Sequence, residues 1–252
     1  MLHQPDPIAF EIFGLEIRWY GILIALGMII AVLISCKRAP KHVLTDNDVL
    51  DLALWMLPIG VIGARLYYVL FNHRYYHSLA DALNIRAGGL AIHGGLIFGL
   101  LAVYFVCKHK KIALLNMADL IIPSVALAQA IGRWGNFFNG EAHGGPTDLP
   151  WGIIVDGVKV HPTFLYESIW CVLLFIFLSY FDLKLRTANG QTFALYMIFY
   201  SVERFFVEGL RTDSLMIGPF KQAQVLSICA IIAGICLFVY VTKKGDSSNA
   251  KK

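Results

Sequence analysis

Charged residues are scarce in this chain: Asp, Glu, Lys and Arg make up only 15% of its 252 residues, whereas soluble domains carry about 25%. Apolar residues make up 58%, and the mean hydropathy is +0.64. A soluble core has no place for this apolar surplus, so lipid is the expected solvent for most of the chain. The net charge of +4 comes from basic residues in short loops, which is not typical of nucleic-acid binding. The sequence therefore predicts an integral membrane protein and excludes an ordinary soluble domain.

Several familiar motifs are missing as well. The five cysteines lie in or beside apolar runs without CxxC spacing, so we expect packing residues rather than disulfides, metal ligands or nucleophiles. The sequence contains no HExxH motif, no GxSxG motif and no metal-ligand cluster, which leaves zinc and serine hydrolases unsupported. The N-terminal segment carries Asp6, Glu11 and Glu16, and we expect no cleavable signal peptide there.

Seven apolar stretches approach the length of about 20 residues that a helix needs to cross a bilayer. Helices are expected because backbone amides that face lipid must be satisfied within their own segment. The predicted fold is an all-α polytopic membrane protein, a single membrane domain over 1–252 with about seven transmembrane helices. The predicted spans are 18–36, 49–71, 89–107, 112–132, 164–181, 193–210 and 223–241.

Clusters of lysine and arginine follow the first, third, fifth and seventh spans. With seven spans these clusters share one side, which the positive-inside rule assigns to the cytoplasm. The N-terminus is then outside and the C-terminus cytoplasmic. Segment 133–163 faces outward as a small head, in which Asp156-Gly157 predicts the turn of a β-hairpin. Pro162 is expected to open the fifth span.

The densest polar feature runs from Gly132 to Glu141, at the outer end of the fourth span. Charges at membrane depth face the bundle interior, are paired and often mark functional sites. Arg133, Asn136 and Glu141 are therefore candidate site residues. The alternative is a snorkelling arginine beside a capped helix end, but it gives Asn136 and Asn139 no purpose.

The sixth span ends in a second polar series. Tyr200, Arg204, Glu208 and Arg211 are spaced by four, four and three residues, which predicts that they share one helix face. One interpretation is a structural Arg–Glu ladder. The other is that Arg204 offers its guanidinium fork to a phosphate while the glutamates orient it. The two interpretations are compatible if Glu208 has a structural role and Arg204 a functional one.

Two further polar residues lie in the outer parts of the first and third spans. His93 is flanked by glycines in an apolar helix and is ionisable near neutral pH; its rival interpretation is a hydrogen-bonded histidine without catalytic duty. Tyr20 lies where interfacial aromatic residues are expected. If these groups converge on one cavity, its two arginines imply an anionic ligand, for which phospholipid phosphate is the abundant candidate.

The motifs occur in an order that resembles the bacterial prolipoprotein diacylglyceryl transferase family. The resemblance runs from Arg18 through the seventh span, and its most specific part is Gly-Arg-x-Gly-Asn-x-x-Asn-Gly-Glu. It rests on four stretches: His93-Gly-Gly-Leu96, Gly132 to Glu141, His161-Pro-Thr-Phe-Leu-Tyr-Glu167 and Arg204-Phe-Phe-Val-Glu208.

The resemblance implies a reaction and a place for it. In the family, a diacylglyceryl group moves from phosphatidylglycerol to the lipobox cysteine thiol of a preprolipoprotein, at the signal peptide. The products are a thioether and glycerol 1-phosphate, and the enzyme lies in the bacterial cytoplasmic membrane. By resemblance, Arg133 contacts phosphatidylglycerol with Arg204 as its partner. The other matching positions in or around the family's site are Tyr20, His93, Asn116, Asp119, Asn136, Glu141, Gly144 and Glu208.

The residues also suit this chemistry. Attack by sulfur on a glyceryl carbon builds negative charge on the leaving phosphate, which fixed guanidinium groups stabilise in a dry cavity. A thiol with a pKa of about 8.5 is mostly protonated at neutral pH. His93 is the candidate base, and thiolate stabilisation by the arginines alone is its rival. No metal or organic cofactor is expected. The competing classes are an anion or lipid transporter, which would normally show repeated halves, and a structural scaffold.

Overall fold

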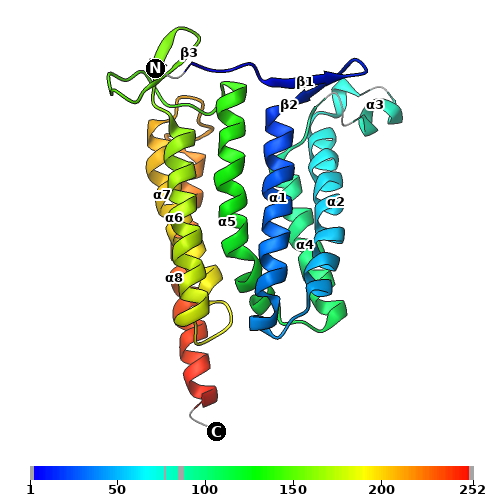
Figure 1. The fold of residues 1–252 in the computed structure, drawn as a ribbon, viewed down its shortest axis with the longest axis vertical. Helices are drawn as coiled ribbons and strands as arrows, with labels where there is room; N and C mark the ends of the chain where they lie inside the picture. The colour runs from blue at the N-terminus through cyan, green and yellow to red at the C-terminus, as the bar shows by residue number, and fades with distance from the viewer. Residues whose placement is uncertain (1–2, 77, 85–87, 250–252) are drawn as a thin grey trace. The chain divides into compact units, whose positions relative to one another are not determined.

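The computed structural model describes residues 3–76, 78–84 and 88–249, and in these ranges the long elements are helices (Figure 1). The predicted all-α fold is confirmed. The long helices are α1 (Trp19–Arg38), α2 (Asp46–Phe71), α4 (Ile92–Lys110), α5 (Leu114–Asn139), α6 (Thr163–Lys184), α7 (Gln191–Leu210) and α8 (Gln222–Asn249). The short ones are η1 (Ala39–His42), η2 (His73–Tyr75) and α3 (Leu79–Leu83).

Six helices in the described ranges are long and apolar enough to cross a membrane: α1, α2, α4, α5, α6 and α8. The seventh long helix, α7, has 20 residues and includes Glu203, Arg204 and Glu208. These charges lie on the stretch where a further span is predicted. The chain is therefore a polytopic helical membrane protein with about seven long helices, and α7 is the one whose polar groups most need partners inside the protein.

The chain forms two compact units. One comprises Met1–Ile34 and Ala118–Lys252, and the other comprises Ser35–Met117. The first unit holds most of α1 and α5 together with α6, α7 and α8. The second holds α2, α3 and α4. Each unit is described by itself.

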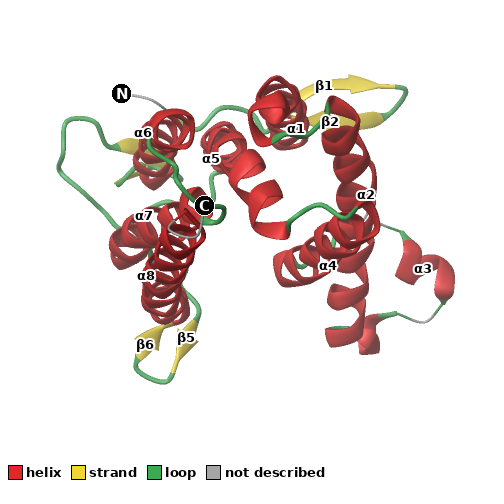
Figure 2. Ribbon diagram, turned by 90° about the horizontal axis from the view of Figure 1, so that it is seen from below, coloured by secondary structure: helices red, strands yellow, loops and turns green. Residues whose placement is uncertain are grey.

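Helix α5 is the central helix of the first unit, lying between α1 and α6 (Figure 2). It is also the most buried candidate span, with 44% of its apolar window buried. Small residues permit the contact with α1: a Cβ atom on Gly27 would lie 3.1 Å from the carbonyl oxygen of Ala128. On the other side, the Ser168 hydroxyl of α6 donates a 2.9 Å hydrogen bond to the Ala130 carbonyl.

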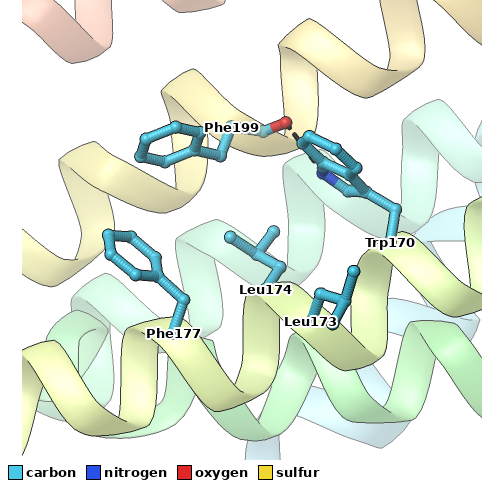
Figure 3. Close-up of a pocket in the computed structure, with 5 residues that line it drawn as sticks. All are labelled: Trp170, Leu173, Leu174, Phe177 and Phe199. Atoms are coloured by element: carbon cyan, nitrogen blue, oxygen red, sulfur yellow. Dashed lines mark hydrogen bonds between the residues drawn. The ribbon is translucent and has the colours of Figure 1, made fainter.

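Helices α6 and α7 also pack together, and a cavity of about 310 Å³ lies between them (Figure 3). The indole Nε1 of Trp170 donates a 3.1 Å hydrogen bond to the Phe199 carbonyl at one end of this cavity. The lining is apolar: Trp170, Leu173, Leu174, Phe177 and Phe199.

The first turn of α7 is fixed by Asp119 of α5. The carboxylate of Asp119 is fully buried and accepts hydrogen bonds from the backbone N–H groups of Gly190, at 2.6 Å, and Phe193, at 2.8 Å. Arg186 lies 3.4 Å from the same carboxylate. The first N–H groups of a helix have no partner within the helix, so Asp119 supplies an acceptor from a neighbouring helix and sets where α7 begins.

In the second unit, α2 and α4 meet through glycines. A Cβ atom on Gly95 would lie 3.6 Å from both the Gly60 carbonyl oxygen and the Ala64 side chain, which is the close approach that small residues allow in membrane helices. Arg65 of α2 is buried. Its guanidinium donates hydrogen bonds of 2.7–3.0 Å to backbone carbonyls within α3, those of Asp81 and Ala82, and after it, those of Gly88 and Gly89.

Three antiparallel hairpins complete the described part of the chain: β1–β2 (Ile8–Ile12 with Leu15–Arg18), β3–β4 (Ile153–Val155 with Val158–Val160) and β5–β6 (Met216–Ile217 with Phe220–Lys221). The β3–β4 hairpin confirms the prediction made from Asp156-Gly157. Both residues have positive φ, 49° and 78°, as a two-residue type I′ turn requires. Helix α6 begins at Thr163, directly after Pro162, as expected.

The α2–α4 contact yields a prediction. In Gly94→Ala the new methyl group would press against the Gly63 carbonyl and the Tyr67 side chain of α2. Overpacking of this kind costs about 1–3 kcal/mol, which exceeds the gain in helix propensity of about 1 kcal/mol. The matched control is Gly99→Ala on the same helix, where the nearest neighbour is Met56 Cγ at 3.9 Å. Thermal unfolding in detergent should show a lower midpoint for the first variant only, and equal midpoints would contradict this packing.

Candidate functional site

Two arginines from different helices share one carboxylate oxygen. Oε1 of Glu167, in the second turn of α6, accepts a 2.8 Å hydrogen bond from Nη1 of Arg204 on α7. The same oxygen lies 3.1 Å from Nη2 of Arg133 on α5. The Glu167 side chain is 1% exposed, so this carboxylate has little access to water. Helices α5, α6 and α7 are thus joined at one point by charge.

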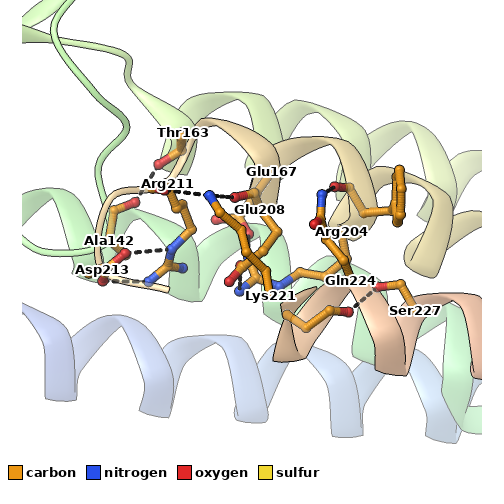
Figure 4. A network of polar contacts seen from close by, with 12 residues as sticks. Ala142, Thr163, Glu167, Arg204, Glu208, Arg211, Asp213, Lys221, Gln224 and Ser227 are labelled. Carbon is orange, nitrogen blue, oxygen red and sulfur yellow. Dashed lines mark hydrogen bonds and ion pairs between the residues drawn. The ribbon is translucent and has the colours of Figure 1, made fainter. Parts of the chain in front are cut away.

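Each guanidinium has a second partner. Nη2 of Arg204 lies 2.6 Å from a carboxylate oxygen of Glu208, one turn further along α7 (Figure 4). Nη2 of Arg133 donates a 3.2 Å hydrogen bond to the Tyr200 hydroxyl. The spacing of Tyr200, Arg204 and Glu208 along one helix face is therefore used as predicted, and it brings all three residues to one cluster.

The two guanidiniums remain partly accessible. The side chains of Arg133 and Arg204 are 18% and 20% exposed, whereas that of Glu208 is 4% exposed. An arginine has five N–H donors, and in these contacts Arg133 uses only Nη2. The carboxylates thus hold both cations from the buried side, and donors on the accessible side are available to an anion.

A third carboxyl group lies beside this cluster. Glu203 is 6% exposed, and neither of its carboxyl oxygens has a hydrogen-bond partner within the part of the chain that the structure describes. It lies three residues after Tyr200 on α7, a spacing that puts these two side chains at neighbouring positions on the helix surface.

Glu141 is held by the two asparagines at the end of α5. The side-chain amides of Asn136 and Asn139 donate hydrogen bonds of 3.1 and 3.2 Å to its Oε1.

The aromatic ring of Tyr20, in the first turn of α1, covers Gly135: a Cβ atom there would lie 2.5 Å from the ring. The glycine is needed at this position because any side chain would displace the tyrosine.

Gly144 connects the segment after α5 to the end of α7. Its N–H group donates a 3.0 Å hydrogen bond to the His161 carbonyl, and that of Gly145 donates a 3.0 Å hydrogen bond to the Leu210 carbonyl. A Cβ atom on Gly144 would lie 2.7 Å from the His161 side chain. The Thr163 hydroxyl adds a hydrogen bond to the Ala142 carbonyl (Figure 4). Close backbone packing therefore fixes this segment beside the cluster.

Arg211 is the residue directly after the last turn of α7. Helix α7 ends at Leu210; the φ of Arg211, −74°, is still helical, whereas its ψ of 144° directs the following chain out of the helix. Its guanidinium pairs with Asp213 at 2.7 Å and thereby lowers the pKa of that carboxyl group. Lys221 caps the same helix end through 2.7 Å hydrogen bonds to the carbonyls of Glu208 and Arg211.

Of the three remaining sequence candidates, one lies in the first unit and two lie in the second. Asp119 is fourteen residues before Arg133 on α5, about 21 Å along the helix axis, where it binds the start of α7. Asn116 and His93 belong to the second unit. The Asn116 amide donates a 2.9 Å hydrogen bond to the His42 carbonyl. His93 is exposed in the first turn of α4.

Sequence reasoning assigned no role to Glu167. The available signal was a carboxyl group within an apolar helix, which requires a partner or a function. The sequence does not show which helix supplies that partner.

As for metals, no group of three or more His, Cys, Asp or Glu residues in ranges 3–76, 78–84 and 88–249 is placed to hold an ion.

Fold and site together define a polytopic helical membrane protein with a buried arginine–glutamate cluster suited to an anionic ligand. Residues 7–240 match the model of the prolipoprotein diacylglyceryl transferase family. The chain belongs to this family, and it is accordingly a transferase.

Similar proteins cover nearly the whole chain. A phosphatidylglycerol–prolipoprotein diacylglyceryl transferase of Clostridioides difficile is 55% identical over 96% of this chain and 98% of its own length. The enzyme of the same name from Finegoldia magna is 49% identical over 98% of this chain and 100% of its own length. That of Clostridium novyi is 48% identical, over 96% and 98% respectively. With its apolar helices, the chain is a membrane-embedded bacterial protein.

The shared carboxylate yields a prediction about stability. Glu167→Gln keeps the side-chain shape but leaves Arg133 and Arg204 without their common counter-ion, and breaking a buried ion pair from one side costs about 3–5 kcal/mol. Glu203→Gln is the matched control, because that carboxyl group has no hydrogen-bond partner among the described residues. Thermal unfolding in nanodiscs should therefore show a marked loss for Glu167→Gln and none for Glu203→Gln. A similar loss in both variants would argue against the bridging role.

Proposed function

We propose that this chain transfers the diacylglyceryl group of phosphatidylglycerol to the lipobox cysteine of a preprolipoprotein. Membership in the family and the names of its relatives support this reaction. The single observation that carries the assignment of the site is the meeting of Arg133 and Arg204 at Glu167. The products are a thioether-linked protein and glycerol 1-phosphate.

The step balances as a substitution at carbon. The substrate thiolate forms a sulfur–carbon bond to the glyceryl carbon, and the bond from that carbon to the phosphate oxygen breaks. The electron pair stays on the departing phosphomonoester, so negative charge grows there. Arg133 and Arg204 stabilise it because their positions are already fixed and need no reorganisation. The thiol proton leaves before or during the attack.

The carboxylates have a positioning role in this proposal. Glu167 and Glu208 hold the guanidiniums from their buried side, so the accessible N–H donors of Arg133 and Arg204 face the phosphate. A planar guanidinium matches phosphate oxygens in a way that an ammonium group does not. The apolar cavity lined by Trp170 begins three residues from Glu167 and suits an acyl chain of the lipid donor (Figure 3).

Polar groups around the end of α5 would bind the rest of the two substrates. Asn136 and Glu141 offer hydrogen bonds to glycerol hydroxyls or to peptide, and Tyr20 flanks them. Gly144 contributes indirectly, because its close packing against His161 holds the segment that follows α5. For Asp119 and Asn116 we propose an indirect role. Asp119 fixes the start of α7, and with it the height of Arg204, whereas Asn116 holds the η1 segment through His42.

We also propose the orientation of the chain in the bacterial cytoplasmic membrane. Helices α1, α4 and α6 each carry basic residues in their last turn, which favours a cytoplasmic location for those ends. The N-terminus then lies outside and the C-terminus inside. The cluster, beyond the middle of α5 and α7, belongs to the outer part of the membrane, where lipobox cysteines of translocated proteins arrive.

The arginines can be tested directly. Arg133→Ala should abolish thioether formation, since alanine cannot bind phosphate, while the protein still inserts. Arg204→Lys should lose roughly 10²-fold or more in rate, the scale of a lost transition-state donor. Arg74→Ala removes an exposed arginine outside the cluster and should retain activity. The measurement is the mass shift of a lipobox peptide incubated with phosphatidylglycerol, and near-normal product from Arg133→Ala would contradict the proposal.

His93 is the proposed base for the substrate thiol. Because a thiol with a pKa of about 8.5 is mostly protonated below that pH, His93→Gln should lower the transfer rate chiefly at acidic and neutral pH and less in alkaline buffer. The pH–rate profile of the reconstituted variant measures this difference. A uniform decrease at every pH would instead indicate a positioning role for His93.

A further inference from the structure

Two of the hairpins lead directly into membrane helices. Strand β2 ends at Arg18 and α1 begins at Trp19, and strand β6 ends at Lys221 and α8 begins at Gln222. No linker separates hairpin from helix in either case. Since α1 and α8 are both long and apolar enough to cross a membrane, covalent continuity places each hairpin at the boundary of the hydrocarbon core.

The β1–β2 hairpin has two chemically different faces. Its register pairs Phe10 with Ile17 and Ile12 with Leu15, and directly paired residues lie on the same face of a sheet. Glu11 pairs with Glu16, and these two carboxylates lie on the opposite face. One face is therefore apolar and the other acidic.

The described residues leave the apolar face of β1–β2 about half exposed. Phe10 is 49% exposed, Ile12 47% and Leu15 50%, and Phe13 at the turn is 101% exposed. An isolated two-stranded hairpin is marginally stable in water. A hairpin with this much exposed apolar surface needs another surface to cover it.

The β5–β6 hairpin also exposes apolar side chains. Met216, Ile217 and Phe220 are 54–64% exposed, and Lys221 at its base is bound to the carbonyls at the end of α7. Both hairpins belong to the first unit, and they project away from its helices on different sides (Figure 2). Two unrelated stretches of sequence thus place exposed apolar side chains at the starts of two membrane helices.

We propose that the β1–β2 and β5–β6 hairpins are interfacial anchors, whose apolar side chains lie in the phospholipid layer between headgroups and acyl chains. The membrane interface accepts apolar side chains on one side of an element and charged ones on the other. The acidic face with Glu11 and Glu16 then faces water. This inference does not depend on the reaction proposed above.

The anchors would set the depth of the candidate site in the bilayer. Tyr20 follows β2 by two residues, and Lys221 of β6 holds the end of α7 that carries Glu208. A shift of either hairpin relative to the lipid layer would move these groups with it. Fixed depth is what an enzyme acting on a phospholipid headgroup needs.

Depth-dependent quenching tests the proposal on the full-length protein. An environment-sensitive fluorescent amino acid is placed singly at Phe13, at Ile217 and, as the matched control on the opposite face, at Glu16. Each protein is reconstituted into phosphatidylcholine–phosphatidylglycerol vesicles, with either nitroxide-labelled acyl chains or aqueous iodide as quencher. The positions are exposed, so the substitutions should not disturb folding, which circular dichroism checks.

The proposal predicts opposite behaviour on the two faces. The probes at Phe13 and Ile217 should be quenched by the nitroxide lipid and protected from iodide, and the probe at Glu16 should show the reverse. Iodide quenching at Phe13 or Ile217 as strong as at Glu16 would overturn the assignment for that hairpin. Protection from both quenchers would also overturn it, because protein, such as a second copy of the chain, would then cover the apolar face.

Discussion

The Oε1 atom of Glu167 is the point on which the arrangement of the candidate site depends. It is buried and contacts guanidinium groups from α5 and α7. A carboxylate in such surroundings is costly unless it is paired, and so are the two arginines. None of these three charged groups would therefore be stable in this buried position without its partners. Their mutual pairing fixes the rotation of three helices relative to one another.

Two contacts with carboxylates of neighbouring helices fix the position of helix α7. Asp119 binds its first turn, and Glu167 binds Arg204 in its second half. Between these two points α7 is held in register along α5 and α6. The charges that distinguish α7 from the six helices apolar enough to cross a membrane therefore include Arg204, which positions it. A helix held at both ends presents its arginine at a fixed height, which preorganised stabilisation of a phosphate requires.

Much of this fold is predictable because its causes are local. Composition and length predict the membrane helices, Asp156-Gly157 predicts the β3–β4 turn, and Pro162 predicts the start of α6. The spacing of Tyr200, Arg204 and Glu208 predicts a shared face for the same reason. The pairing of Arg211 with Asp213 is not predictable in this way, because helical spacing says nothing about the chain beyond the helix end.

The remaining features depend on how helices rotate against each other, which a single sequence does not encode in any local pattern. Glu167 bonds to residues 34 positions earlier and 37 positions later in the chain. The β1–β2 and β5–β6 hairpins were not predicted either, because their strands are only two to five residues long and precede the predicted spans 18–36 and 223–241. The features that were not predicted are therefore ion pairs between residues far apart in the sequence and the exposed apolar side chains of the two hairpins.

The central claim is that Arg133 and Arg204, joined through Glu167, act as one unit toward a phosphate. A double-mutant cycle measures this most directly, with phosphatidylglycerol affinity determined for the wild type, Arg133→Ala, Arg204→Ala and the double variant. Coupled arginines predict that either single substitution removes most of the affinity and that the second adds little. Strictly additive losses would show two independent contacts and would contradict the account.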